Sequence, residues 1–200
     1  VSRRDDAEGD LYLLPLEKRE DGFAPGKIKR LTHNLEREAF PQFSPDGKKI
    51  AYSFGAKGQE QIWLYEIKNG ARYQLTTRGG TQPAWSPNGS ELALACRTGE
   101  TSEQQIFIIS ADTAQADYLR RQVTFEGDNH FPAWSRDGKS ILVQRNESSA
   151  NARASRLYIV PVDFSTTHFD QLAAGLQITP DSESALFPCW SRDGAIYYAA

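Results

Sequence analysis

The chain alternates between short apolar runs and polar turns over almost its whole length. Segments such as Ile62-Trp-Leu-Tyr65 and Ile106-Phe-Ile-Ile109 are apolar at successive positions. Short continuous runs bounded by turns favour strands that are covered on both faces, because a half-exposed strand would alternate polar and apolar residues. The pattern therefore predicts an all-β protein whose sheets are covered on both sides.

One motif occurs four times and sets the period of this pattern. Each copy reads Pro-x-aromatic-Ser-x-Asp/Asn-Gly, at intervals of roughly 40–55 residues. Asp-Gly or Asn-Gly between two apolar runs is a strong hairpin signal, since both residues tolerate a positive φ. Proline has no N–H to donate and suits the first residue of a strand. The four copies are Pro41–Gly47, Pro83–Gly89, Pro132–Gly138 and Pro188–Gly194.

The same succession of elements follows each motif. An apolar run comes after the turn, then a polar loop, a second apolar run and a short strand that ends in threonine. The first runs are 50–54, 92–96, 141–143 and 196–199; the second are 11–16, 62–67, 106–109 and 157–162; the threonine strands are 30–32, 74–76, 122–124 and 177–179. Four strands per unit of this length predict a β-propeller of four-stranded antiparallel blades.

These residues resemble the WD40-like repeat family typified by TolB, also called PD40 repeats. The family signature is similar to Pro-x-Trp-Ser-Pro-Asp-Gly followed by an apolar strand, Ile-Tyr/Trp and Leu-Thr, and the resemblance covers nearly all of residues 10–200. Phe43 replaces the tryptophan in the first repeat, and Arg136 and Arg192 replace the second proline in the last two. The resemblance implies the fold, whereas the function is left open because such blades are attached to many activities.

A single propeller domain is expected over residues 1–200, with about four blade-equivalents. Complete blades are predicted at about 41–77, 83–124 and 132–179, and half-blades at 10–33 and 188–200. Pairing of the half-blades would close a four-bladed ring. However, Val1-Ser-Arg-Arg4 matches the end of a strand that Ile196–Ala199 already supplies, which favours part of a longer propeller. A partial ring would expose strand edges and is expected to self-associate.

Composition and charge argue against several kinds of partner. The net charge is −3, and basic residues are spread among acidic ones, so no nucleic-acid partner is expected. No run approaches the roughly 18 apolar residues of a membrane helix, so no direct membrane insertion is expected. The chain begins at Val1 and has no methionine, which is compatible with a removed export signal. Cys96 and Cys189 lie in different repeats, and Cys189 takes the place of Ala84 and Ala133, so both are expected to be buried free thiols.

The loops at the mouth of the central channel form the predicted binding face. We name the strands of each blade A to D from the motif strand outward; the D–A and B–C loops gather on one face of a propeller. A rim of mixed charged and aromatic residues suits a peptide or a sugar. Phe40, Phe131 and Phe187 precede the motif proline and are expected to pack between blades. The candidate contacts for a protein or peptide partner are Arg37, Glu38, Arg78, Gln82, Asp128, Asn129, His130 and Glu183.

No pattern in the sequence indicates catalysis. The chain has no Gly-x-Ser-x-Gly elbow, phosphate-binding glycine loop, paired catalytic carboxylates or Cys-x-x-Cys. His33, His130 and His168 are too scattered for a zinc site. The Ser and Asp/Asn residues of the motif are expected to be turn residues on the face opposite the channel mouth. The sequence therefore predicts no catalytic residue, no cofactor and no metal.

The leading interpretation is a non-catalytic binding module that resembles TolB and works in the periplasm or elsewhere outside the cytoplasm. One alternative is the substrate-gating propeller of a prolyl-oligopeptidase-like serine peptidase whose hydrolase domain is absent from these residues. A propeller that is itself an enzyme, as in oligogalacturonate lyases, is disfavoured by the scattered histidines. A sensory propeller domain of a larger protein is also compatible. The insertion Asp163–Leu176, with one helical turn at 169–174, is expected at the blade periphery as decoration or a partner contact.

Overall fold

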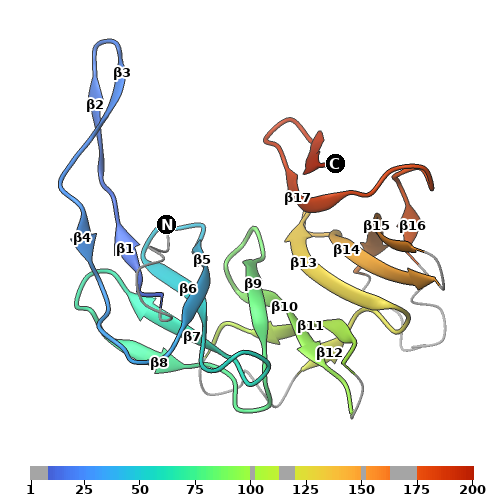
Figure 1. Cartoon of the computed structure of the whole chain (residues 1–200). Helices are drawn as coiled ribbons and strands as arrows, with labels where there is room; N and C mark the ends of the chain where they lie inside the picture. The colour runs from blue at the N-terminus through green and yellow to red at the C-terminus, as the bar shows by residue number, and fades with distance from the viewer. Residues whose placement is uncertain (1–8, 100–101, 113–119, 150–151, 163–174) are drawn as a thin grey trace.

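The computed structural model describes residues 9–99, 102–112, 120–149, 152–162 and 175–200, and its regular elements are strands β1 to β18. Three of the sheets have four antiparallel strands each. The four strands of each of these sheets are consecutive in the chain. Figure 1 shows these sheets side by side in an open arc that runs from the N-terminus to the C-terminus. The predicted all-β propeller fold is confirmed, as a partial propeller.

The complete blades contain the strands in the predicted order. Blade 1 consists of β5 (Glu38–Phe43), β6 (Lys49–Phe54), β7 (Gln61–Glu66) and β8 (Arg72–Gln74). Blade 2 consists of β9 (Thr81–Trp85), β10 (Glu91–Arg97), β11 (Gln104–Ser110) and β12 (Arg121–Gln122). Blade 3 consists of β13 (Asp128–Trp134), β14 (Ser140–Ser149), β15 (Ala152–Pro161) and β16 (Leu176–Gln177). In blade 3 the β14–β15 hairpin extends well beyond the predicted runs 141–143 and 157–162.

The core is a series of apolar layers between successive sheets. Successive residues of β10 point to opposite faces: Leu92 and Leu94 join Ile62 of blade 1, whereas Ala93 and Ala95 join Ile141 of blade 3. All six side chains are fully buried. A strand between two neighbours must therefore be apolar on both faces, which explains the continuous runs in the sequence.

The first half-blade differs from the prediction. Only β1 (Tyr12–Leu13) and β4 (Lys29–Arg30) pair with each other, so the predicted run 11–16 is too long. The segment between them forms a separate hairpin, β2 (Leu16–Arg19) with β3 (Gly22–Pro25), which projects away from the blades in Figure 1. Asp21-Gly22 provides the turn, with Gly22 at a φ of 132°.

The last half-blade consists of β17 (Leu186–Trp190) and β18 (Ile196–Ala199), which pair only with each other. The two half-blades therefore do not close a four-bladed ring. Both cysteines are free, but Cys189 is exposed and not buried as predicted, because no further blade covers this sheet. Val1–Arg4 and the predicted helical turn at 169–174 lie outside the described residues.

Candidate functional site

Each inner strand contains a residue in the left-handed backbone region, and all four occupy the position before the motif proline. Phe40, Gln82, Phe131 and Phe187 have φ values of 54°, 55°, 48° and 52°. The strand register is interrupted at the same places. The proline thus lies inside the strand, at a bulge, and not at its first residue as predicted. Such a conformation costs a non-glycine residue about 1–3 kcal/mol and must be held by its surroundings.

At three of these bulges, a side chain of the preceding blade accepts a hydrogen bond from the backbone N–H of the left-handed residue. Gln82 N donates to Ser53 Oγ at 3.0 Å, and Phe131 N donates to Gln82 Oε1 at 2.7 Å. Phe187 N donates to Gln144 Oε1 at 3.0 Å. Because every one of these bonds crosses between blades, the strained positions also connect neighbouring sheets.

The left-handed conformation brings the phenylalanine rings together. The ring centroids of Phe40 and Phe131 are 5.9 Å apart and those of Phe131 and Phe187 are 4.9 Å apart, both edge to face. Phe187 is 60% exposed. The three rings line a groove of about 430 Å³ that runs along the four inner strands. The sequence prediction treated these phenylalanines as packing residues, although their shared position before the proline already set them apart.

Arg78 and Glu183, two of the predicted contact residues, have a backbone carbonyl that is held by an arginine and a side chain that is exposed. Arg120 Nη1 donates to the carbonyl of Arg78 at 3.1 Å, and the buried Arg156 donates through Nη1 to the carbonyl of Glu183 at 2.7 Å. The side chains of Arg78 and Glu183 are exposed. The exposed Arg37 extends its guanidinium to 5.8 Å from the ring centroid of Phe40.

Asp128 and His130 interact with each other. His130 Nε2 lies 2.9 Å from Asp128 Oδ1, and both side chains are partly buried. Burial opposes ionisation of Asp128, but hydrogen bonds from His130, from the N–H of Gln104 and from Asn146 outweigh it, so the pKa of Asp128 lies below its ordinary value. A negative charge is therefore held at the start of β13, next to His130, whose ring centroid lies 6.2 Å from that of Phe131.

Three of the residues predicted to contact a partner use their side-chain polar groups in hydrogen bonds within the chain. Glu38 is 2% exposed and accepts hydrogen bonds from Leu11 N, from Thr32 and from Asn34. Its burial outweighs these hydrogen bonds and raises its pKa. Asn129 is fully buried and bonded to Gln105. Gln82 contributes its side-chain oxygen to the bulge of Phe131. These three side chains stabilise the loops and strands around the groove. We therefore do not include them among the proposed contacts with a partner.

The comparison with family models decides where the chain belongs. The model described as the TolB beta propeller domain, PD40, matches residues 12–195. The chain belongs to the PD40 family of TolB β-propeller domains. The TolB of Acinetobacter baumannii covers 88% of this PD40 chain with a TM-score of 0.66 at 20% identity, and this chain covers 41% of that structure. The likeness confirms the fold.

Two curated relatives have a higher sequence identity to this PD40 domain than the Acinetobacter structure has. The uncharacterized peptidase YuxL of Bacillus subtilis is 36% identical over 112 residues, and the Tol-Pal system protein TolB of Francisella tularensis is 33% identical over 107 residues. Each match covers 52% of this chain, but it spans only 16% of YuxL and 24% of TolB. The PD40 domain thus corresponds to a minor part of either relative.

The turns of the PD40 motif have the predicted structural role. Asp46 Oδ1 accepts hydrogen bonds from Ser44 Oγ at 2.7 Å and from Lys48 N at 3.0 Å. The Ser135–Asp137 pair repeats this arrangement. Hydrogen bonds from the serines hold the pKa of both carboxyls below the ordinary value. The motif serines are thus committed to the turns.

Among the residues that the structure describes, the histidine, cysteine and acidic side chains form no group of three or more with the geometry to hold a metal ion. Within the same residues, no helix is long and apolar enough to cross a membrane.

Proposed function

We propose that this PD40 domain is a non-catalytic binding module that docks a protein or peptide on the face of the D–A loops. An apolar side chain of the partner would enter the groove beside Phe187 and Phe131, and Arg37 and Arg78 would contact acidic residues of the partner at the rim. The chemistry of the site favours a peptide with an apolar or aromatic anchor next to a carboxylate.

The observation that carries this proposal is the aromatic cluster at the strained inner positions. The ring of Phe187 is 60% exposed, so most of its apolar surface is still in contact with water. Burying it against a partner would be favourable, and the bonds between blades already fix its position, so little ordering is needed on binding. Strained backbone that is held by its surroundings is often found at binding sites.

The likeness to the Tol-Pal system protein TolB supports a protein partner and a location outside the cytoplasm. We make both part of the proposal for this chain. The relative is named as a protein of the Tol-Pal system.

Peptide selection tests this proposal. A library of displayed peptides is selected on the full-length protein, and the affinity of the enriched peptides is measured by calorimetry. Phe187→Ala is expected to weaken binding by about tenfold or more. Its melting temperature should change little, because the ring is mostly exposed.

Leu176→Ala is the matched control. Leu176 is 70% exposed and lies on β16, the outermost strand of blade 3. Two strands separate β16 from the inner strand β13, which lines the groove. Peptide binding should be unchanged in this variant. Enriched peptides that bind wild type and Phe187→Ala equally well would refute the proposed face.

A substrate-gating propeller of a serine peptidase is the second candidate, and the match to YuxL specifically favours it. The 200 residues contain no Gly-x-Ser-x-Gly elbow, so the nucleophile would lie elsewhere in the full protein. Treating the full-length protein with a fluorophosphonate probe distinguishes the two functions. Covalent labelling of one serine outside this domain would support the peptidase; an unlabelled protein that binds peptides would support the binding module.

A further inference from the structure

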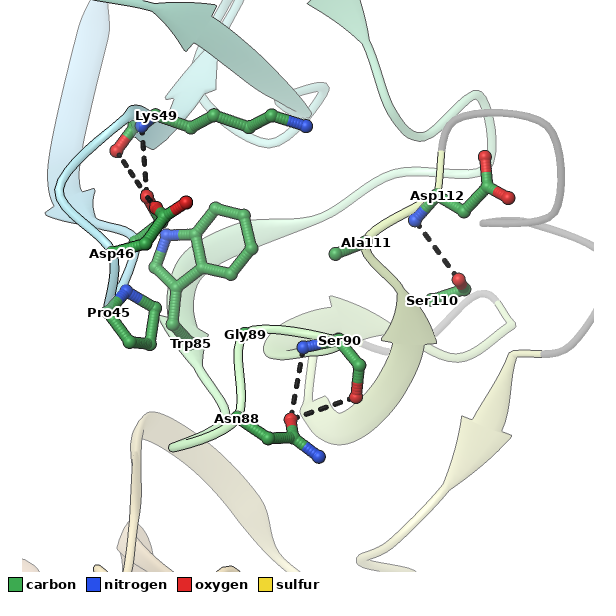
Figure 2. Close-up of a pocket in the computed structure, with 11 residues that line it drawn as sticks. Pro45, Asp46, Lys49, Trp85, Asn88, Gly89, Ser90, Ser110, Ala111 and Asp112 are labelled. Atoms are coloured by element: carbon green, nitrogen blue, oxygen red, sulfur yellow. Dashed lines mark hydrogen bonds between the residues drawn. The ribbon is translucent and has the colours of Figure 1, made fainter.

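A second cleft lies between blades 1 and 2 at the motif turns, at the other end of the inner strands from the phenylalanine rings. Pro45 and Trp85 line both this cleft and the aromatic groove. It encloses about 670 Å³, within the range of about 300–1,000 Å³ that is usual for small-molecule sites. Figure 2 shows the ring of Trp85 between the turn of Asp46, the turn of Asn88 and the segment that follows β11 at Ala111.

The repeat explains why the cleft is open at this interface. Ala111 N donates to the carbonyl of the residue after the hairpin glycine, as do Ile67 N in blade 1 and Val162 N in blade 3. These three positions are therefore equivalent, and blade 2 has the smallest side chain. Val162 belongs to the same buried cluster as Trp134, which is only 8% exposed. With Ala111 in that place, Trp85 stays partly open to the cleft.

A second position that borders the same cleft also has a shorter side chain in blade 2. The residue after the hairpin glycine is Lys48 in blade 1 and Lys139 in blade 3, but it is Ser90 in blade 2. Ser90 turns back and donates its hydroxyl to Asn88 Oδ1 at 2.8 Å. Blade 2 therefore has the shorter side chain at both of these positions, Ser90 and Ala111, which line the cleft with Trp85.

The tryptophan is held in place, and polar groups surround it. Its indole N–H donates to the carbonyl of Gln42 at 3.1 Å, which fixes the plane of the ring. Asn88 Oδ1 is occupied by Ser86 and Ser90, so the hydrogen-bonding capacity that Asn88 can offer a ligand is its NH₂ group. Asp46 contributes a carboxylate and Lys49 an ammonium group to the lining.

We propose that this cleft binds a neutral carbohydrate, with one pyranose ring stacked on Trp85. The C–H face of a pyranose is apolar and matches the aromatic plane, while its equatorial hydroxyls both donate and accept hydrogen bonds. Asn88 and Lys49 can donate to them, and Asp46 can accept; Asp112 adds a second carboxylate to the lining. The two carboxylates disfavour an anionic ligand, and the ammonium of Lys49 disfavours a cation.

Titration with cellobiose and N,N′-diacetylchitobiose tests the proposal on the full chain labelled with ¹⁵N. The side-chain N–H signal of Trp85, assigned with Trp85→Phe, is expected to shift, while those of Trp134 and Trp190 stay in place. Ala111→Ile introduces the residue of blade 1 and fills the cleft. It should weaken sugar binding by about tenfold or more without lowering the melting temperature.

Two matched variants separate binding from folding. Ala111→Ser keeps the cleft open and should bind like wild type. Asn88→Asp retains a residue that the sister turns use but removes the amide donor, so it should weaken binding several-fold at unchanged stability. If Ala111→Ile fails to fold, Ala111→Val, with the residue of blade 3, replaces it.

Several results would overturn the inference. They are an unshifted Trp85 signal with both disaccharides, equal sugar binding by Ala111→Ile and wild type, and loss of sugar binding in Phe187→Ala. The last result would assign the sugar to the aromatic groove. The carbohydrate site does not depend on the proposed peptide-binding function, so either can fail alone.

Discussion

The tryptophan of the repeat connects adjacent blades through both its ring and its indole N–H. Trp134 donates to the carbonyl of Ala84 at 3.2 Å, and Trp190 donates to the carbonyl of Ala133 at the same distance. Each acceptor belongs to the inner strand of the preceding blade. A tryptophan can therefore provide packing area and a directed bond at one interface, which the phenylalanine at Phe43 in the first repeat cannot do.

Truncation of Trp134 and truncation of Trp85 should lower the free energy of unfolding by different amounts. Trp134→Ala is expected to lower the free energy of unfolding by about 3–5 kcal/mol, because the ring is buried in the core between blades 2 and 3. Trp85→Ala should cost clearly less, since its ring borders the open cleft. Urea unfolding of both variants measures the difference. Equal losses would contradict the packing that distinguishes Ala111 from Val162.

The buried Glu38 predicts a specific dependence of stability on pH. Burial raises its pKa above the ordinary 4.5. In the window above pH 4.5 the folded protein binds this proton more tightly than the unfolded chain, so the contribution of Glu38 to stability falls as the pH rises. Glu38→Gln should remove this contribution. Urea midpoints from pH 4.5 to 7 measure it, with the exposed Glu36→Gln as the control; parallel profiles for wild type and Glu38→Gln would reject the assignment.

At the scale of elements, the β2–β3 hairpin is an addition to the blade and not a part of it. All four residues of β2 are exposed, and an isolated two-stranded hairpin contributes little stability of its own. Its base is closed by the bond from Gly26 N to the carbonyl of Pro15 at 2.8 Å. The Asp21-Gly22 turn is visible in the sequence, but the apolar Leu16 made the preceding run look like a longer blade strand.

Removing this hairpin should therefore leave the propeller intact. Replacing Leu16–Pro25 with Asn-Gly keeps a two-residue turn between Pro15 and Gly26. The free energy of unfolding should change by about 1 kcal/mol or less, because the deleted side chains make few buried contacts. Calorimetric unfolding provides the measurement. A loss of several kcal/mol would show that the hairpin packs on the blades.

The features that could be predicted from the sequence are local ones, such as hairpin turns. The features that were missed depend on contacts between neighbouring blades. The hairpin turn at Asp137-Gly138 follows from the preferences of its own residues. By contrast, no intrinsic preference places Phe131 at a positive φ; Gln82 of the preceding blade imposes it by accepting the Phe131 N–H. The open cleft likewise requires a comparison of Ala111 with its counterparts and knowledge of what they cover. Both candidate sites therefore become apparent only when the blades are placed side by side.

At the scale of the whole molecule, the described blades stack side by side, and the arc ends in a two-stranded sheet at each end. Strand β18 pairs with β17 on one edge, whereas the equivalent strand β10 pairs with both β9 and β11. Tyr197 and Tyr198 on β18 are 63% and 41% exposed. An unpaired edge next to apolar side chains is a template for another strand. The free edge of β18 is therefore open to pairing with a strand of another chain.

The 200-residue chain by itself should therefore associate through this edge. Sedimentation velocity is expected to show oligomers that grow with protein concentration. Tyr197→Lys should shift the distribution toward monomer, because a charged side chain on an edge strand opposes pairing with another chain. The same change at Tyr73, an exposed tyrosine on the outer strand of a complete blade, should have little effect. A wild-type chain that stays monomeric at all concentrations, or equal effects of the two lysines, would show that the β18 edge does not drive association.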